Sequence, residues 1–470
     1  MSAPVTSPVR HTRPAFTRLR HVSAFTICLT APLSAGLVSP LSAQSAAKPI
    51  TQDVYDLWRG IVSPTLSPDG QWVAYTNSPS IGDGTLVVRA TSASTEFSVP
   101  RGFTGRPNDR PSATGGFSPA AASFSGDGRH VAALIYPTRA EVEAARRDRR
   151  RAAEANRTTL VLMALPSGQV TNIPRVRSFR FARDGGAVLV YQLEADSARN
   201  GNGRDSAGAA RPAAPAPGAR DTTRRATPRR ESGSPLVVRT LATGAEVRIE
   251  DVTAFTLDDA EKWLAYVVGD TDSTKAGLFL RDLTNGTVHT LRGGRARYRG
   301  LTFDRTATQL AFLEAPYDTI APARAEYTIW HAPLVTRRNA PPVATAIVGT
   351  RDADAALRIP ERSSLEFTRD GSALQFGIAP PPPDSIPADS LADKAVYDLW
   401  HWQDTRLQPT QALQAGRDRN RTYSAIHHPK LRKTLRLADD SLPQVQVSDD
   451  GKLALAVTSV PYEIESMWGE

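Results

Sequence analysis

The chain reads Leu66-Ser67-Pro68-Asp69-Gly70-Gln71-Trp72-Val73-Ala74-Tyr75 near its start: an apolar residue, a short polar stretch, Asp-Gly and an alternating run. Asp-Gly between two apolar runs predicts a tight β-hairpin, because glycine readily adopts the positive φ that such turns need. The run from Trp72 to Tyr75 has the two-residue period of a β-strand. This stretch therefore predicts two antiparallel strands joined by a turn.

The same pattern returns six more times along the chain. Four copies keep Asp-Gly and two have lost it; the turn positions of all seven are Asp69, Asp127, Asp184, Ala260, Thr306, Asp370 and Asp450. Consecutive turns are 46 to 80 residues apart. Propeller blades need roughly 40–50 residues, and the longer spacings contain visible insertions. A solenoid of stacked strands is the alternative, but its repeats are shorter and more regular.

A second pair of apolar runs follows each hairpin, as in Leu236–Leu241 before Thr243-Gly244 and Leu278–Leu283 before Asn285-Gly286. Each unit is therefore expected to hold about four antiparallel strands, which is one propeller blade. A single blade cannot bury both of its faces, so the blades must pack on one another. We predict an all-β fold over residues 48–470, a β-propeller of about seven four-stranded blades. The last blade is expected to be incomplete, because the sequence stops soon after its first hairpin.

Three insertions interrupt the repeats. Residues 139–157 are rich in Ala, Arg and Glu, which favours a short exposed helix or a charged flap, with a solvated insertion without a partner as the plain alternative. Residues 195–233 are rich in Ala, Pro, Gly and Arg with few large apolar residues, so we expect disorder there. The proline-rich loop at 380–387 is expected to be stiff and extended.

The net charge of +9 is concentrated outside the repeats. The N-terminal leader, residues 139–157 and residues 195–233 carry +4, +3 and +4 of it, so the rest of the chain is close to neutral. A nucleic-acid partner would need a basic stripe on the fold itself, so we expect no such partner.

The N-terminus has the features of an export signal. Four arginines precede a mostly apolar or small segment from Val22 to Ala43, and Pro32 and Pro40 disfavour a lasting membrane helix there. Leu41-Ser42-Ala43 is a suitable cleavage site, which makes residues 1–43 the expected signal peptide. The only cysteine, Cys28, lies in this leader. We expect an exported protein, periplasmic or secreted, with no disulfide and no stable membrane insertion.

The sequence offers no catalytic, cofactor-binding or metal-binding residues that we can name. A Gly-x-Ser-x-Gly elbow is absent, since no two glycines are four positions apart. The only histidine cluster, His427-His428, points to opposite faces of a strand and is expected to be structural or exposed rather than a metal site. The repeated aspartates are expected to serve their turns, where the side chain accepts bonds from the backbone. No cofactor is expected.

Two aromatic stretches remain, Tyr55–Ile61 before the first repeat and Tyr397–Pro409 late in the chain. In the second, Leu399 and His401 alternate with Trp400 and Trp402, which suits a strand. Tryptophan rings at such places fill the wedge between blades more often than they form a binding surface, so we expect the first role.

These stretches carry a resemblance to a known family. An opening of Val54-Tyr55-Asp56-Leu57-Trp58 followed by the first repeat is similar to the propeller of prolyl-oligopeptidase family serine peptidases, closest to the large secreted bacterial members described as dipeptidyl or acylaminoacyl peptidases. The stretch YDLWHWQDTRLQPTQ (Tyr397 to Gln411) resembles a recurrent signature of that group, as does the segment from Arg417 to Lys452. The resemblance covers nearly all of the chain after the leader.

In that family, a propeller caps a C-terminal α/β-hydrolase domain with Ser, Asp and His, and limits entry to short peptides. This sequence lacks the hydrolase domain, so no catalytic residue can be carried over. The resemblance implies a fragment, the substrate-gating, non-catalytic portion of such a peptidase, whose peptide substrate is handled through the missing domain. The alternative is a stand-alone periplasmic propeller, similar to TolB-like proteins, that binds a protein partner. A third interpretation, an enzyme site in the central channel, needs converging side chains that sequence alone does not place.

Overall fold

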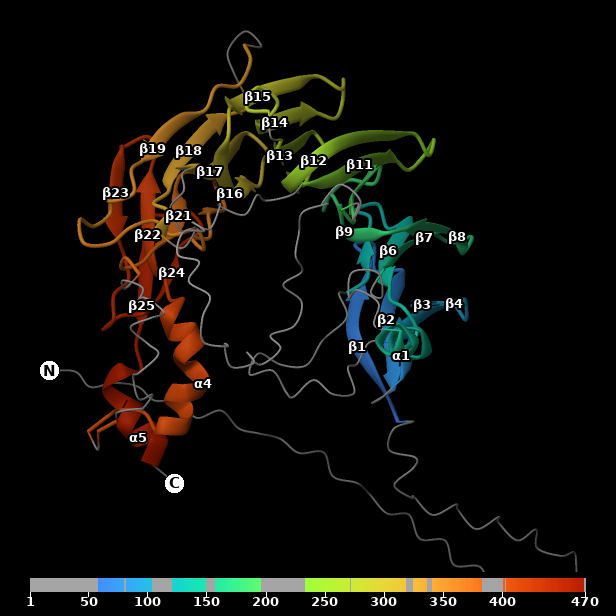
Figure 1. Cartoon of the computed structure of the whole chain (residues 1–470), viewed down its shortest axis with the longest axis horizontal. Helices are drawn as coiled ribbons and strands as arrows, with labels where there is room; N and C mark the ends of the chain where they lie inside the picture. The colour runs from blue at the N-terminus through green and yellow to red at the C-terminus, as the bar shows by residue number, and fades with distance from the viewer. Residues whose placement is uncertain are drawn as a thin grey trace, which may run out of the picture. The chain divides into compact units, whose positions relative to one another are not determined.

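The computed structural model describes residues 58–79, 82–103, 121–148, 157–195, 233–270, 272–317, 324–335, 340–382, 400–401 and 403–468. Over these residues the fold is a β-propeller made of consecutive antiparallel sheets, as Figure 1 shows. The prediction of an all-β propeller is confirmed. The predicted export signal, residues 1–43, and most of the insertion 195–233 lie outside the described residues.

The first three blades follow the chain in order. Blade 1 holds β1 (Arg59–Leu66), β2 (Trp72–Pro79), β3 (Asp83–Ala90) and β4 (Glu96–Phe103). Blade 2 holds β5 (Ser123–Phe124), β6 (His130–Ile135), β7 (Thr159–Ala164) and β8 (Gln169–Pro174). Blade 3 holds β9 (Val176–Phe181), β10 (Val188–Leu193), β11 (Ser234–Thr240) and the first half of β12 (Glu246–Leu257).

The second half of β12 opens blade 4, so blades 3 and 4 share one seven-stranded sheet. Blade 4 continues with β13 (Trp263–Val268), β14 (Gly277–Asp282) and β15 (Val288–Gly293). Within β12, the residues up to Val252 pair with β11 and those from Val252 onward pair with β13. The pairing register shifts on both sides of this point, next to Asp251 with φ of 55°.

The last three blades complete the array. Blade 5 holds β16 (Ala296–Phe303), β17 (Gln309–Pro316), β18 (Thr328–Pro333) and β19 (Thr345–Val348). Blade 6 holds β20 (Glu366–Phe367), β21 (Leu374–Ile378), β22 (Tyr423–His428) and β23 (Lys433–Arg436), with β22 between β21 and β23 in Figure 1. Blade 7 has two described strands, β24 (Gln444–Val447) and β25 (Ala454–Val457), followed by η4 (Val460–Tyr462) and α5 (Glu463–Trp468).

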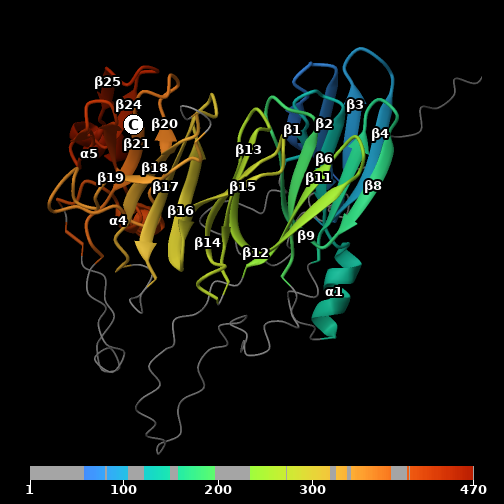
Figure 2. The same ribbon diagram turned by 90° about the horizontal axis from the view of Figure 1, so that it is seen from above.

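Two further helices of the described residues lie in connections within blades. Helix α1 (Arg139–Arg147) follows β6 and stands apart from the strands in Figure 2. It falls in the insertion for which the sequence favours a short exposed helix. Helix α4 (Gln408–Arg419) lies between β21 and β22. Among the described residues, none of the helices has the length and apolar character needed to cross a bilayer.

The core consists of apolar layers between consecutive blades. Five clusters of buried side chains each draw on two neighbours, from blades 1 and 2 through to blades 5 and 6. Strand β13 shows how: Leu264 and Tyr266 pack in the layer shared with blade 3, whereas Trp263, Ala265 and Val267 pack in the layer shared with blade 5. Successive residues of a strand face opposite ways, so each blade covers both neighbours.

The repeated turns are held by a hydroxyl–carboxylate pair. In blade 1 the buried Ser67 hydroxyl donates to Asp69 and accepts the amide of Trp72 at 2.9 Å. The same Asp69 carboxylate accepts the amide of Gln71 at 3.1 Å, and Gly70 takes a φ of 70°. The equivalent pairs are Ser125–Asp127, Thr368–Asp370 and Ser448–Asp450. The aspartates therefore serve the turns, as predicted.

In the copies without Asp-Gly, an aspartate stands two positions earlier, in place of the hydroxyl residue, and accepts the amides of the turn. Asp258 accepts the amides of Trp263 at 2.7 Å and Ala260 at 3.2 Å. Asp304 plays this part in blade 5 and accepts the amides of the two residues that lead into β17. At the glycine position stand Glu261 and Ala307, with φ of 57° and 54°.

Turns of neighbouring blades also contact one another. Blade 3 lacks the hydroxyl, and there Glu261 of blade 4 accepts the amides of Ala187 at 2.9 Å and Val188 at 3.1 Å. Any Cβ on Gly185 would lie 2.2 Å from the Glu261 carboxyl carbon, so this approach requires glycine. Blades 5 and 6 make a similar contact, in which Gln309 of blade 5 donates to the carbonyl of Gly371 in blade 6 at 2.8 Å.

One sequence interpretation is wrong. The alternation predicts a strand from Leu399 to Trp402 with its rings wedged between blades. Trp400 and His401 belong to no strand, and Trp400 is 56% exposed, while Leu399 and Trp402 lie outside the described residues. Trp58 in the other aromatic stretch is also exposed. The alternation suits a strand, but the connection between β21 and β22 gives these residues no neighbouring strand to pair with.

Candidate functional site

The candidate site is a cleft between blades 4 and 5. Its empty space is about 450 Å³, counting its open mouth. It is lined by Thr253 of β12, the end of β13 and the two residues after it, Ala276 just before β14, the β15–β16 connection, the start of β16, and Tyr317 just beyond β17. The repeated turns precede β13 and β17, so the cleft lies at the opposite ends of these two strands.

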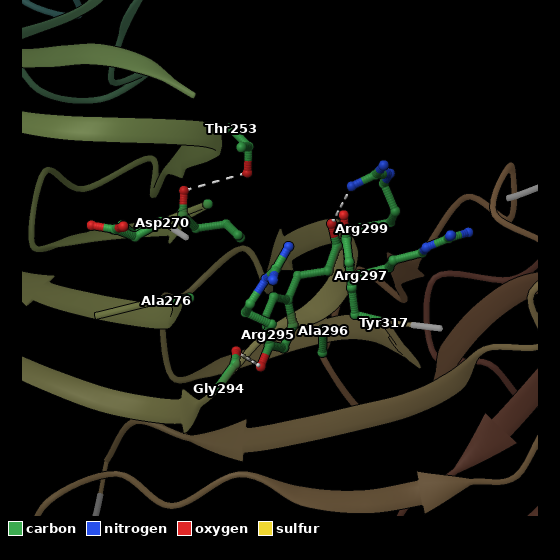
Figure 3. Close-up of a pocket in the computed structure, with 13 residues that line it drawn as sticks. Thr253, Asp270, Ala276, Gly294, Arg295, Ala296, Arg297, Arg299 and Tyr317 are labelled. Carbon is green, nitrogen blue, oxygen red and sulfur yellow. Dashed lines mark hydrogen bonds between the residues drawn. The ribbon is translucent and has the colours of Figure 1, made fainter. Parts of the chain in front are cut away.

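Three arginines line the cleft at alternate positions, Arg295 just before β16 and Arg297 and Arg299 within it, and Figure 3 labels all three. Arg299 is held in place, because it donates to Glu361 at 2.8 Å and to the Tyr298 carbonyl at 2.9 Å. The guanidinium carbons of Arg295 and Arg297 lie 4.4 and 5.9 Å from the centre of the Tyr317 ring. Arg295 is exposed and Arg297 is buried.

A tyrosine between the arginines is fixed by packing. Tyr298 is 2% exposed, meets Phe312 edge-on, and donates its hydroxyl to the carbonyl of Gly294 at 3.4 Å. Burial, with a smaller contribution from the nearby negative charge of Glu314, raises the pKa of Tyr298 to about 12. This phenol stays protonated at neutral pH and acts as a hydrogen-bond donor, not as a base.

The described lining of the cleft is cationic. Besides its three arginines it includes one acidic residue, Asp270. Asp270 accepts the amide of Asp272 at 3.0 Å, and in Figure 3 it lies on the opposite side of the cleft from Arg297 and Arg299. A positive lining around an aromatic ring suits an anionic group, because guanidinium groups bind carboxylates with planar, paired hydrogen bonds.

The structure separates the residues that the sequence singled out. The turn aspartates are spread over the blades, one turn each, so they do not form a common acidic site. His427 is buried and its Nδ1 lies 2.9 Å from the Thr434 hydroxyl, whereas His428 is half-buried. Burial lowers the pKa of His427, with a further contribution from His428. His427 therefore contacts the neighbouring strand β23 through Thr434.

Part of the stretch that carries the family resemblance forms a polar cluster around Arg406. Arg406 donates to Glu463 of α5 and to Gln414 of α4, both at 2.9 Å. Asp404 accepts the backbone amide of His401 at 2.9 Å and the side-chain amide of Gln411 at 3.2 Å, while Thr405 donates to Glu463 at 2.8 Å. We call these side chains, with Asp418, the Arg406 cluster. It ties the connection before β22 to the segment after β25.

The cleft was not predicted from the sequence. Arg295-Ala296-Arg297-Tyr298-Arg299 is visible as arginine at every second position, but it sits in a chain with 57 basic residues. Tyr317 is separated from it by a whole strand, and only the pairing of β16 with β17 brings the two together. Within the described ranges, no group of three or more His, Cys, Asp or Glu side chains is placed to hold a metal ion.

Comparison with known proteins adds little beyond the general fold. No protein-family model matches the sequence, and no curated protein matches it. Among solved structures, similar chains include Porphyromonas gingivalis dipeptidyl peptidase 4, with 10% identity and a TM-score of 0.42 over 82% of this chain and 48% of that one. A prolyl endopeptidase has 10% identity and a TM-score of 0.39, over 83% of this chain and 44% of that one.

The β-propeller domain of the trilobed protease from Pyrococcus furiosus is also similar, with 8% identity and a TM-score of 0.33 over 69% of this chain and 80% of that one. This chain spans less than half the length of the dipeptidyl peptidase and the prolyl endopeptidase. At such TM-scores the likenesses carry no argument about activity, and the propeller fold rests on the strand pairing described above.

Proposed function

We propose that this chain is the non-catalytic, substrate-gating propeller portion of an exported serine peptidase of the prolyl-oligopeptidase family that acts on short peptides. The carrying observation is the resemblance of Val54–Tyr75 and of Tyr397–Gln411 to that family. The Arg406 cluster supports it, because polar side chains of the second stretch hydrogen-bond to helices α4 and α5 and so have a structural role in this fold.

In this proposal the nucleophile, base and acid belong to an α/β-hydrolase domain of a longer parent protein. Acyl transfer through a serine would take place there. The propeller would restrict which peptides reach it. We expect the 470-residue chain alone to show no peptide hydrolysis, and we propose no cofactor for it.

The first test is to sequence the genomic DNA downstream of codon 470. An open frame that continues into a Gly-x-Ser-x-Gly elbow, then Asp and His, would support the proposal. A stop codon directly after Glu470 in intact intergenic sequence would overturn it and leave the periplasmic, TolB-like binding propeller as the better account.

A protein-level test uses antibodies raised against this propeller. From cells of the source organism they should precipitate a species longer than this chain that reacts with a fluorophosphonate probe for active serines. A precipitated species of 50.7 kDa or less that the probe leaves unlabelled would contradict the proposal. Cell fractionation with the same antibodies tests export, for which the signal should be in the periplasm or the medium.

A further inference from the structure

An arginine that stacks on an aromatic ring and binds a carboxylate already exists between blades 4 and 5. The Arg292 guanidinium lies 3.9 Å from the centre of the Trp330 ring and donates to both oxygens of Glu314, at 2.8 and 2.9 Å. The hydrogen bonds to Glu314 raise the pKa of Arg292. The ring holds the guanidinium flat from one side, and its edge is left to take a carboxylate with two parallel bonds.

Arg295 repeats half of this arrangement. Its guanidinium lies 4.4 Å from the centre of the Tyr317 ring, close to the spacing of Arg292 over Trp330. Among the described residues, no carboxylate lies within ion-pair distance of Arg295. Arg295 and Tyr317 thus match the guanidinium and the ring of the first arrangement. The place that corresponds to Glu314 is open cleft at Arg295.

We propose that the cleft between blades 4 and 5 binds the carboxylate of a small ligand, with Arg295 stacked on Tyr317 as the anchor. The ligand is either a short peptide with a free C-terminal carboxylate or a small organic acid. This binding does not rest on the proposed peptidase function, because it needs only the described propeller.

The surroundings of Arg295 fit this role. Arg297 and Arg299, on the strand that follows Arg295, add positive charge, and Arg299 is fixed by Glu361. Backbone groups of Gly269 and Gly294 line the cleft without side chains that would fill it. A ligand carboxylate would thus meet a cationic, open pocket whose aromatic wall is already positioned.

The test is isothermal titration of the full chain with three probes: an N-acetylated tetrapeptide with a free C-terminus, the same peptide as its C-terminal amide, and succinate. We expect the free acid to bind and the amide to bind at least about tenfold more weakly, since a charge-assisted pair is lost. Succinate binding as tightly as the peptide would assign the site to small acids; peptide binding alone would assign it to peptides.

Variants locate the binding. Arg295→Ala should weaken the free-acid peptide about tenfold or more, and Arg295→Lys should restore part of it, because lysine keeps the charge but lacks the planar fork. Tyr317→Leu should also weaken binding, through loss of the ring that orients Arg295. Arg248→Ala is the matched control, since Arg248 is an exposed arginine that pairs with Glu250 away from the cleft; it should bind as the wild type does.

Three outcomes overturn the proposal: no binding of any carboxylate probe at millimolar concentration, equal affinity for acid and amide, or unchanged affinity in Arg295→Ala. Arg295 is exposed, so its variants are expected to fold, and equal urea midpoints would verify this. A fall in affinity at higher salt is expected for the wild type and should be smaller in Arg295→Ala.

Discussion

The repeated turn depends on where its oxygen atoms stand more than on Asp-Gly itself. Four blades use a hydroxyl and an aspartate two residues apart, and blades 4 and 5 use Asp258 and Asp304 at the hydroxyl position. In each case the oxygen accepts the amide that starts the second strand. The copies that look worn in the sequence are therefore complete as turns, and the sequence pattern of Asp-Gly understates the repeat.

Glu261 is a turn residue of blade 4 that binds backbone amides of blade 3, so its removal should destabilise blade 3. Glu261→Ala leaves the amides of Ala187 and Val188 without their carboxylate, and we expect a loss of about 1–2 kcal/mol in the free energy of unfolding. Glu261→Gln should lose less, because its carbonyl oxygen can still accept one amide. Urea unfolding measures both.

The control for Glu261 is Glu250→Ala, which breaks an exposed pair with Arg248. It should change the free energy of unfolding by less than about 0.5 kcal/mol. If Glu261→Ala were no more destabilising than Glu250→Ala, the contact between the two turns would contribute nothing to stability.

The turn aspartates also predict how stability responds to acid. Hydrogen bonds from Ser448, Lys452 and the backbone lower the pKa of Asp450 to about 2, and similar bonds lower the pKa of Asp69 and Asp370. An unfolded aspartate has a pKa of about 3.9. Their contribution is therefore present above about pH 4 and lost as the pH falls toward about 2.

The pKa of Asp258 is shifted in the opposite direction, because burial raises it. Between its unfolded and folded pKa, its ionisation lowers stability as the pH rises. Urea midpoints measured at successive pH values below 5 should fall less steeply in Asp450→Asn than in the wild type, whereas Asp258→Asn should not reduce the slope. Parallel curves for all three proteins would contradict this assignment.

At the scale of elements, the sequence predicted the hairpins well and the connection before β22 poorly. Hairpins depend on neighbours in sequence, so a turn and an alternating run suffice. The stretch that contains Trp400 contacts Glu463 through Thr405 and Arg406, about sixty residues away along the chain, and its local alternation gave the wrong answer. The cluster of Arg295, Arg297 and Arg299 with Tyr317 was missed for the same reason, because the pairing of β16 with β17 brings them together.

The Arg406 cluster makes a prediction for α5. This helix has six residues, too few to be stable alone, and its first residue is tied to Arg406. Arg406→Ala should raise amide exchange in Glu463–Trp468 by about tenfold or more, since opening would cost less free energy. Mass-spectrometric hydrogen exchange measures this segment directly.

Arg417→Ala is the matched control, because Arg417 is an exposed arginine in the last turn of α4. It should leave α5 exchange unchanged. Fast exchange of α5 already in the wild type, or equal rates in both variants, would show that the cluster does not hold the helix.

At the scale of the whole molecule, the prediction of a propeller depended on the repeated hairpins. Seven hairpins at blade spacing imply stacked sheets, and the layers between blades 1 through 6 follow from strands that bury both faces. Blade 7 differs from the others in the described residues. Leu455 and Val457 of β25 and Leu453 just before it stand at alternate positions and are 64%, 54% and 75% exposed.

This exposed row should make the isolated chain self-associate, because unpaired strand edges with apolar faces pair with other chains. Leu453→Lys should therefore lower the weight-average mass in sedimentation at high concentration. Leu431→Lys is the control, since Leu431 is 73% exposed but lies in the turn between β22 and β23. A wild-type chain that stays monomeric at all concentrations would contradict this prediction.

The shared strand β12 has a mechanical consequence. A propeller pulled from its ends can lose blades one after another, each release adding a length of slack chain. Blades 3 and 4 cannot separate in this way, because the twelve residues of β12 are hydrogen-bonded to β11 on one half and to β13 on the other. Under force these two blades form a single mechanical element, and their rupture would release both lengths in one step.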